Sequence, residues 1–557
     1  MSAAIIGACV VLFALYYGVA MAGPNALGLW QDDGIYACTA QAIAEGADYR
    51  HIEIPGEPLQ TKYPIAYPAM LALGMVVAGA YPSNLWLLHV PAALAAAGLV
   101  VIAVLYLRKV FPERTRTIWM AGALAALSPA IVSLVRFTMS DLPYAALAAA
   151  ALYVVDIKCH EYDTKRRWWW TIAGSLLAGT AMLTRGIGIT LAGAIVVNLA
   201  MRRRFKQAVV AALLLITCFG AWQVRQRQAA KANGSLQESF LVAPEMSYSM
   251  WLPDSASQTL RTVAHNTLSG AFGLVYFQLA FPEGAVQSAL QQGGWRLVGL
   301  HVLCYGAVGL ALWSFAASAR KRLLALHWYA VFYAGLALAW PFQPYRFLDP
   351  WTPFILFFLL DGVWRVAALI ARPLAVGGRG RVATWVSGVV ALVLLGVFVV
   401  EDARIAGSSA DAFHLRGAQA NLTELENLEH WIAGQTEAGD IVASSMPARL
   451  FLATGRQGHY FWPDSDPYRQ YYGVDRSAAM FYVIGGPSEQ AYLAQQINER
   501  ALAAYRAGQV DYYVEQAGLS PASLVMGQFV RSHPEAFEPV YRTPKGVFTV
   551  FAFQSGG

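Results

Sequence analysis

Long apolar runs recur through most of this chain and constrain its fold more than any other feature. A helix needs about 20 apolar residues to cross a bilayer, and helices packed inside a bundle tolerate somewhat fewer. The chain has 557 residues, of which 57% are hydrophobic and only 13% are charged, a composition that excludes a soluble globular protein. We therefore predict a polytopic α-helical membrane protein with about eleven spans, at 3–22, 84–107, 117–134, 142–157, 168–184, 187–201, 207–222, 295–318, 323–341, 351–370 and 382–400.

Basic residues gather in alternate loops and predict the orientation of these spans. Loops rich in Lys and Arg stay on the cytoplasmic side of a membrane. The N-terminus is then cytoplasmic, and everything after Val400 lies outside the cytoplasmic (inner) membrane, in the periplasm or the extracellular space. The clusters occur at 108–116, 158–167, 202–206, 320–322 and 372–381.

One apolar stretch, Ile65 to Ala80, does not fit as a span. If it crossed the bilayer, every basic cluster would move to the outside. We predict instead a helix at 65–80 that lies in the outer interface or re-enters it, beside an outer loop at 30–64. The long segment 223–294 is predicted to be an outer loop that serves as a substrate lid.

The composition changes after Val400, which divides the chain into a membrane domain, 1–400, and an outer domain, 401–557. Alternating helical and strand patterns predict a compact α/β fold for the second. None of the five cysteines has metal-ligand spacing or an evident disulfide partner. The predicted helices are 422–433 and 489–507, and the predicted strands are 441–444, 451–453, 480–484, 512–514 and the terminal GVFTVFAF.

Two adjacent carboxylates, Asp32 and Asp33, follow the first span and open a predicted helix that ends near Gly46. Carboxylates suit the first turn of a helix, so Asp32 has a simple interpretation as a cap. The pair, however, lies at the mouth of a membrane domain and is followed by Lys62 in a turn marked by proline. This context favours a chemical role.

Single arginines stand at the outer ends of three hairpins: Arg136, Arg185 and Arg346. Each has a simple interpretation as a side chain that extends toward the membrane surface. As a set on the Asp32 side they indicate an anion site, because the guanidinium fork matches a phosphate. Asp141, which begins another span, either caps its helix or pairs with Arg136.

These residues carry a resemblance to a family. Asp32-Asp33-Gly-Ile-Tyr36, then Gly46, then Lys62-Tyr63-Pro64 and Tyr67-Pro68 resemble the first outer loop of the GT-C membrane glycosyltransferases. The most similar group is that of the protein O-mannosyltransferases and the bacterial lipid A aminoarabinose transferase. The segments around Asp141 (SDLP) and Arg346 (PYRFLDPWTP) are also similar. The second acid is usually Glu in the family and is Asp33 here, and Thr61 and Tyr63 flank the lysine where the aminoarabinose transferases have Glu and Pro.

The resemblance implies an enzyme that transfers a sugar from a polyprenyl-phosphate donor to a lipid, glycan or protein acceptor at the outer face of the bilayer. Asp32 is then the candidate general base. Asp33 orients the acceptor or binds a divalent metal, and both roles stay open. No other cofactor and no nucleic-acid partner is predicted. The candidate substrate-binding residues are Tyr36, Lys62, Arg136, Asp141, Arg185, Tyr345 and Arg346.

Two other classes of protein stay open at this point. Spans that contain charged residues could form a transporter or flippase of lipid-linked sugars. Transporters, however, place polar groups near the midplane of the membrane, whereas these charges gather at the outer ends of the spans. A catalytically silent scaffold that binds a partner through its outer domain is the third class.

Overall fold

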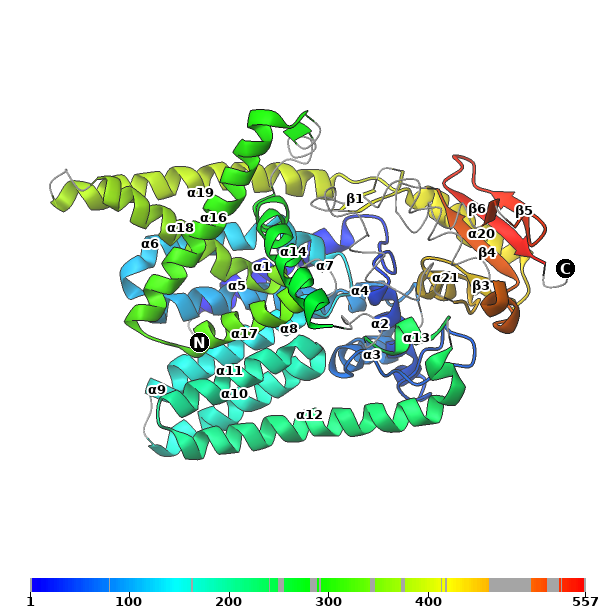
Figure 1. Ribbon diagram of the computed structural model, residues 1–557, viewed down its shortest axis with the longest axis horizontal. Coiled ribbons are helices and arrows are strands. Elements are labelled where there is room, and N and C mark those ends of the chain that lie inside the picture. Colours follow the sequence, from blue (N-terminus) through cyan, green and yellow to red (C-terminus); the bar gives the residue numbers. More distant parts are fainter. Residues whose placement is uncertain are drawn as a thin grey trace.

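A bundle of long helices and a smaller mixed sheet domain lie at opposite ends of the molecule (Figure 1). The bundle helices are α1 (Ala3–Met21), α5 (Val90–Val110), α6 (Thr115–Ala126), α7 (Pro129–Val135), α8 (Asp141–Tyr153), α10 (Thr164–Thr184), α11 (Ile189–Met201), α12 (Phe205–Asn233), α14 (Ala256–Gly273), α16 (Gly294–Lys321), α17 (Ala325–Ala339), α18 (Thr352–Ile370) and α19 (Val376–Ala406). The computed structural model describes residues 3–79, 81–161, 164–239, 241–248, 255–280, 288–289, 292–340, 346–371, 376–411, 413–415, 418–459, 502–517, 530–531 and 533–554.

A helix is present at each predicted span, which confirms a polytopic helical fold. By length and apolar composition, seven helical segments of the described chain can cross a membrane. Of the other four predicted spans, α11 and α17 have only 13 and 15 residues, α10 begins with a basic run, and α8, with 13 residues, continues into a helical turn that contains Asp156 and Lys158. These four helices as spans remain a prediction. The seven segments are Ala3–Met21, Leu85–Val110, Pro112–Val135, Phe205–Gln237, Gly294–Lys321, Arg346–Ile370 and Gly380–Ala406.

Four of the five basic clusters meet at one end of the bundle. Lys109 binds Glu161 at 2.8 Å, which joins the first cluster to the second. Arg204 donates to the carbonyl of Cys159 at 3.2 Å, and Lys321 lies 4.0 Å from Glu113. The alternate loops therefore share one end, and the C-terminal domain lies at the other (Figure 1).

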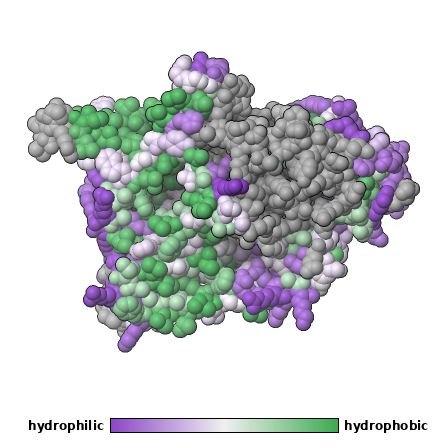
Figure 2. Space-filling model, in the orientation of Figure 1, coloured by the Kyte–Doolittle hydropathy of each residue, from purple (hydrophilic) through white to green (hydrophobic). Residues whose placement is uncertain are grey.

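Between these two polar ends the bundle presents an apolar surface. Figure 2 shows hydrophobic residues over the helices, bordered by hydrophilic residues at the left edge and toward the C-terminal domain. Side chains such as Val11, Ile216 and Leu392 are 67%, 64% and 68% exposed. Exposed aliphatic side chains on long helices are stable only against lipid or a partner. This surface fits a bilayer.

The predicted interfacial helix is observed as α3 (Ala66–Ala78), which has 13 residues and packs against α2 (Asp32–Ala44). Its outer side is apolar, with Leu73, Val76 and Val77 between 69% and 76% exposed. Its place in the lipid interface remains a prediction that this exposed face supports.

The predicted loop 223–294 is wrong over much of its length. α12 continues to Asn233, and the short α13 (Ala243–Met246) and the long α14 follow. The tail of α12 reads QVRQRQAAKAN, and Ala, Gln, Arg and Lys are strong helix formers although they are polar. The aromatic stretch around Trp251 lies outside the described residues.

The C-terminal domain is built on a four-stranded sheet of order β3-β4-β6-β5. β3 (Val442–Ala443) pairs in parallel with β4 (Tyr512–Gln516), and β6 (Phe548–Phe553) lies antiparallel between β4 and β5 (Phe537–Arg542). Separately, β1 (Phe413–Leu415) pairs antiparallel with β2 (Ala418–Ala420). Helix α20 (Leu422–Gln435) is capped by the side chain of Asn421, which accepts from the N–H of Glu424 at 3.0 Å.

The predictions for this domain were partly correct. The helix at 422–433 and the strands at 441–444, 512–514 and the C-terminus are confirmed. The strand at 451–453 is wrong, because the segment belongs to helix α21 (Pro447–Thr454), which has Pro at its start and the left-handed Gly455 at its end. The strand at 480–484 and most of the helix at 489–507 lie outside the described residues.

Helix α21 packs directly against the segment that begins α2. Arg449 binds Glu429 at 2.5 Å and donates to the carbonyls of Asn25 and Leu27 at 3.2 and 2.8 Å. Gly28 has φ +86°, and a Cβ at this position would lie 2.6 Å from the Cβ of Arg449. Glycine is needed here both for the backbone conformation and for this close approach.

We expect Gly28→Ala to lower the free energy of unfolding by about 1–3 kcal/mol, because it adds left-handed strain and a clash with Arg449. Gly46→Ala is the matched control, since Gly46 has φ +77° and a Cβ added there would meet no other atom within 4 Å. The melting temperature of the purified protein in detergent measures both. Equal shifts for the two variants would show that the approach of α21 adds nothing.

Candidate active site

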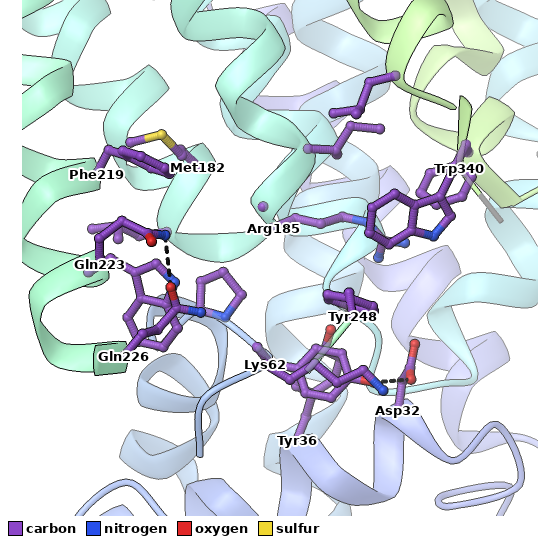
Figure 3. A pocket seen from close by; sticks show the side chains of 18 of the residues that line it. Asp32, Tyr36, Lys62, Met182, Arg185, Phe219, Gln223, Gln226, Tyr248 and Trp340 are labelled. Carbon is purple, nitrogen blue, oxygen red and sulfur yellow. Dashed lines mark hydrogen bonds between the residues drawn. The ribbon is translucent and has the colours of Figure 1, made fainter. Parts of the chain in front are cut away.

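A cavity of about 260 Å³ opens where α2, α10, α12 and the segment before α18 meet. One side of it carries charged and aromatic groups, among them Asp32, Lys62, Arg185, Tyr248 and Trp340 (Figure 3). The other side carries Met182, Phe219, Gln223 and Gln226 (Figure 3). The remaining lining residues are Tyr36, Tyr63, Pro64, Leu183, Gly186, Ile187, Trp222, Leu336, Arg346 and Phe347.

The two carboxylates at the start of α2 have different surroundings. Asp33 is completely buried, and its two oxygens accept from the N–H groups of Gly28, Trp30 and Gly34 at 2.8, 3.2 and 3.0 Å. Burial raises the pKa of Asp33 to about 6, against the lowering effect of these hydrogen bonds. Asp33 therefore fixes the turn into the helix and does not line the cavity.

Asp32 faces the cavity. Its carboxylate accepts from the hydroxyl of Tyr63 at 2.6 Å and from the guanidinium of Arg346 at 2.8 Å, and it makes no capping bond to the helix. The cap interpretation is therefore wrong for Asp32. Burial would raise the pKa of Asp32, but the charges of Arg346 and Lys62 and the bond from Tyr63 outweigh burial, so the pKa lies below its ordinary value. The group is ionised at neutral pH.

Two arginines converge on Asp141. Arg185 binds its Oδ2 at 2.6 Å, and Arg346 lies 3.3 Å from the same oxygen. The Asp141 side chain is 1% exposed, so Asp141 affects the cavity through the two arginines that it binds. Ser140, the preceding residue, links Arg185 at 3.2 Å to the hydroxyl of Tyr36 at 3.0 Å. The result is a bridge from Asp32 through Arg346 to Asp141, which fixes both guanidinium groups at the cavity wall.

Lys62 reaches the cavity from the loop after α2. Its ammonium group lies 3.7 Å from Oε2 of Glu245 and about 5 Å from the ring centres of Tyr63 and Tyr248, at 5.2 and 5.0 Å. The Lys62 side chain is only 7% exposed. A cation held between two aromatic rings in a partly closed cavity is well placed to bind an anion.

The extended tail of α12 holds the loop that carries Lys62. Arg225 donates to the carbonyls of Gln60 and Tyr49, and Gln226 donates to the carbonyl of Thr61. Gln60 in turn accepts from the N–H of Lys62 at 2.7 Å. The continuation of α12 beyond the predicted span thus fixes the position of the lysine.

The structure brings Asp32, Tyr36, Lys62, Arg185 and Arg346 to one cavity, with Asp141 directly behind the arginines. It does not bring Arg136 there. Arg136 is buried near Gly23 and donates to the carbonyl of Ile405 at 2.7 Å. The predicted pairing of Arg136 with Asp141 is wrong, because Asp141 binds Arg185 and Arg346. Tyr345 lies outside the described residues.

Several residues of the site were not predicted. Glu245 and Tyr248 come from the segment predicted to be a loop, where no pattern marks a carboxylate as a partner of Lys62. Tyr63 belongs to the motif that contains Lys62, and its position beside the lysine is the signal that marks it. Within the described residues, no group of three His, Cys, Asp or Glu side chains could hold a metal ion. The oxygens of Asp33 are occupied by N–H groups, which does not support Asp33 as a metal ligand.

Comparison with known proteins identifies relatives of this fold. Residues 62–222 match the family model described as dolichyl-phosphate-mannose-protein mannosyltransferase. The crystal structure of ArnT from Cupriavidus metallidurans in the apo state is 13% identical, with a TM-score of 0.53 over 99% of this chain and 98% of that one. The same protein bound to undecaprenyl phosphate is 14% identical, with a TM-score of 0.52 and the same coverage. No curated protein sequence matches the chain.

A third structure belongs to a longer protein. The Archaeoglobus fulgidus oligosaccharyltransferase, tethered to an acceptor peptide, is 13% identical, with a TM-score of 0.52 over 99% of this chain and 74% of that one. The fold and the matched region together confirm the expected resemblance to the GT-C membrane glycosyltransferases. Within this class the chain resembles the protein mannosyltransferase and ArnT types.

Proposed function

We propose that the chain transfers a sugar from a polyprenyl-phosphate donor to a hydroxyl group of a lipid, a glycan or a protein, with Asp32 as the general base. The observation that carries the proposal is the ionised carboxylate of Asp32 in the same cavity as Lys62, Arg185 and Arg346. The match to a family of lipid-phosphate-sugar enzymes and the likeness to a structure that holds undecaprenyl phosphate support the nature of the donor.

The charges in the cavity suit this reaction. As the acceptor oxygen bonds to the anomeric carbon of the sugar, its proton passes to Asp32. The bond between that carbon and the phosphate oxygen breaks, and its electron pair stays with the phosphate. A phosphodiester with one negative charge becomes a monoester with two, and positioned cations stabilise the growing charge. Lys62 and the guanidinium groups of Arg185 and Arg346 supply them.

The apolar side of the cavity fits the remainder of the donor. Met182, Leu183 and Phe219 line the cavity on α10 and α12, and we place the polyprenyl chain of the donor against them. Trp340 and Tyr248 stand near the charged end, and flat aromatic rings of this kind pack well against the apolar faces of sugars. We assign the phosphate to the junction of these two regions.

We place the reaction on the outer side of the cytoplasmic membrane. The cavity lies at the end of the bundle opposite the four basic clusters, which the positive-inside rule assigns to the cytoplasm. A reporter fused after Gly557 tests this orientation, because it must be active only outside the cytoplasm. Activity of that reporter in the cytoplasm would reverse the assignment.

The experiment that tests the proposed function uses the purified protein in detergent, a panel of polyprenyl-phosphate sugars and a membrane extract as the source of acceptor. We expect the wild type to release polyprenyl phosphate and to transfer the sugar. A transporter or flippase would move the lipid but leave the sugar–phosphate bond intact, and a scaffold would do neither. No cleavage over the whole panel contradicts the enzyme.

The lowered pKa of Asp32 gives a pH dependence with a definite sign. Because the carboxylate stays ionised below the ordinary range of an aspartate, kcat/KM for the donor is expected to fall only at a pH below that range. Tyr63→Phe removes the hydrogen bond that lowers this pKa, so the acid limb of the profile should move to higher pH. The pH profiles of the two proteins check this. An acid limb that stays in place in Tyr63→Phe would contradict the role of Asp32.

A further inference from the structure

Each cation that faces the cavity is paired with a carboxylate, but the pairs differ in closeness. Arg185 lies 2.6 Å from Asp141, a distance typical of a strong charge-assisted hydrogen bond. The ammonium group of Lys62 lies 3.7 Å from Glu245, beyond hydrogen-bond distance. Coulomb attraction falls with distance, so Glu245 attracts Lys62 less strongly than Asp141 attracts Arg185.

Glu245 is buried and hydrogen-bonded to a second residue. It is 2% exposed and does not line the cavity. Its other oxygen accepts from the side chain of Gln31, the residue before Asp32. Its helix α13 is tied to the loop of Lys62, since the hydroxyl of Thr61 donates to the carbonyl of Met246 at 2.6 Å. A phosphate that binds Lys62 must therefore compete with this buried carboxylate.

We propose that Glu245 is a positioning residue that weakens the hold of the site on lipid phosphate by competing for Lys62. This inference rests on the proposed function, because it assumes that a lipid phosphate occupies the cavity. The product carries one more negative charge than the donor, so the cations alone would bind it more tightly than the donor. The charge of Glu245 opposes that binding and favours release of the product.

The test measures binding of undecaprenyl phosphate to the full-length protein in detergent, through the change in tryptophan fluorescence, since Trp222 and Trp340 line the cavity. Glu245→Gln removes the charge but keeps an oxygen for Gln31. We expect its Kd to fall about tenfold, equivalent to about 1.4 kcal/mol. The matched control is Glu57→Gln, because Glu57 pairs with Arg50 in the same outer loop and is 44% exposed. That variant is expected to bind as the wild type does.

Two further measurements separate the charge from a structural role. Uncharged undecaprenol should bind equally to the wild type and to Glu245→Gln. In a Lys62→Met background, Glu245→Gln should give no gain in affinity for the phosphate. Gln31→Ala removes only the hydrogen bond to Glu245 and should not tighten binding either.

The outcomes distinguish this inference from the proposed function. An unchanged or weaker affinity of Glu245→Gln for undecaprenyl phosphate, with normal binding by the wild type, overturns the role of Glu245 alone. A gain that persists without Lys62, or that extends to undecaprenol, also overturns it. Absence of binding by the wild type overturns both this inference and the proposed donor site.

Discussion

Replacing Asp32 by Asn is expected to lower sugar transfer by ~10²–10⁴-fold, the usual contribution of a general base. Asparagine has nearly the same shape and can still accept a hydrogen bond from Tyr63, so the protein should fold and insert normally. It cannot take a proton from an acceptor hydroxyl. The rate of transfer by the purified variant, at saturating donor, measures the effect.

Asp48→Asn is the matched control for this prediction. Asp48 lies in the same outer loop, is exposed, and has φ +70°, a conformation that asparagine adopts readily. Its substitution should leave transfer unchanged. Near-normal transfer by Asp32→Asn would contradict the role of Asp32 as the general base. Its contact with Arg346 would then be the only role left for Asp32.

The second large effect is expected for substitution of Arg346, because its guanidinium group joins two carboxylates across the site. Its guanidinium lies 2.8 Å from Asp32 and 3.3 Å from Asp141, and it is 21% exposed. A charge-assisted contact to a phosphate contributes roughly 1.5–3 kcal/mol. We expect Arg346→Ala to lower donor use by about one to two powers of ten, since ~1.4 kcal/mol is tenfold.

Arg346→Lys tests the geometry of this contact apart from its charge. A lysine has one point of charge and cannot bridge Asp32 and Asp141 as a planar fork does, so it should restore only a part of the loss. The control is Arg365→Lys. Arg365 binds Asp361 at 2.6 Å near the opposite end of the bundle, and Asp361 keeps Arg114 at 2.7 Å. Full activity of Arg346→Lys would contradict a bridging role.

Patterns of local sequence predicted much of this molecule. The apolar runs and the alternating basic clusters gave the helical bundle and its polar ends, because lipid requires long apolar helices. The short motif predicted Asp32 and Lys62 as site residues, and the pattern of single arginines predicted Arg185 and Arg346. These four residues come from three distant parts of the chain, and only the fold brings them to one cavity.

The sequence did not predict the directions in which side chains point or the contacts between distant parts of the chain. Adjacent helical residues point about 100° apart, so Asp32 faces the cavity while Asp33 turns toward backbone N–H groups. Nothing local shows which of the two does so. Arg136 has the same local setting as Arg185, yet it points to the carbonyl of Ile405.

Polar helices were the other source of error. The tail of α12 is hydrophilic because it extends beyond the apolar part of the bundle, and the apolar periodicity of the helix ends before it. Its composition of strong helix formers was the signal that could have extended the helix. The partner of Lys62, Glu245, lies in the segment that follows, and its role depends on a tertiary contact alone.

The most direct test of the central claim is a structure of the protein with an uncleavable donor, an undecaprenyl-phosphate sugar whose bridging oxygen is replaced by a methylene group. We predict that the phosphate lies within about 2.7–3.2 Å of Lys62 and of at least one of Arg185 and Arg346, with the anomeric carbon on the side of Asp32. A phosphate bound away from these three cations, or a sugar on the side of the cavity far from Asp32, would contradict the account.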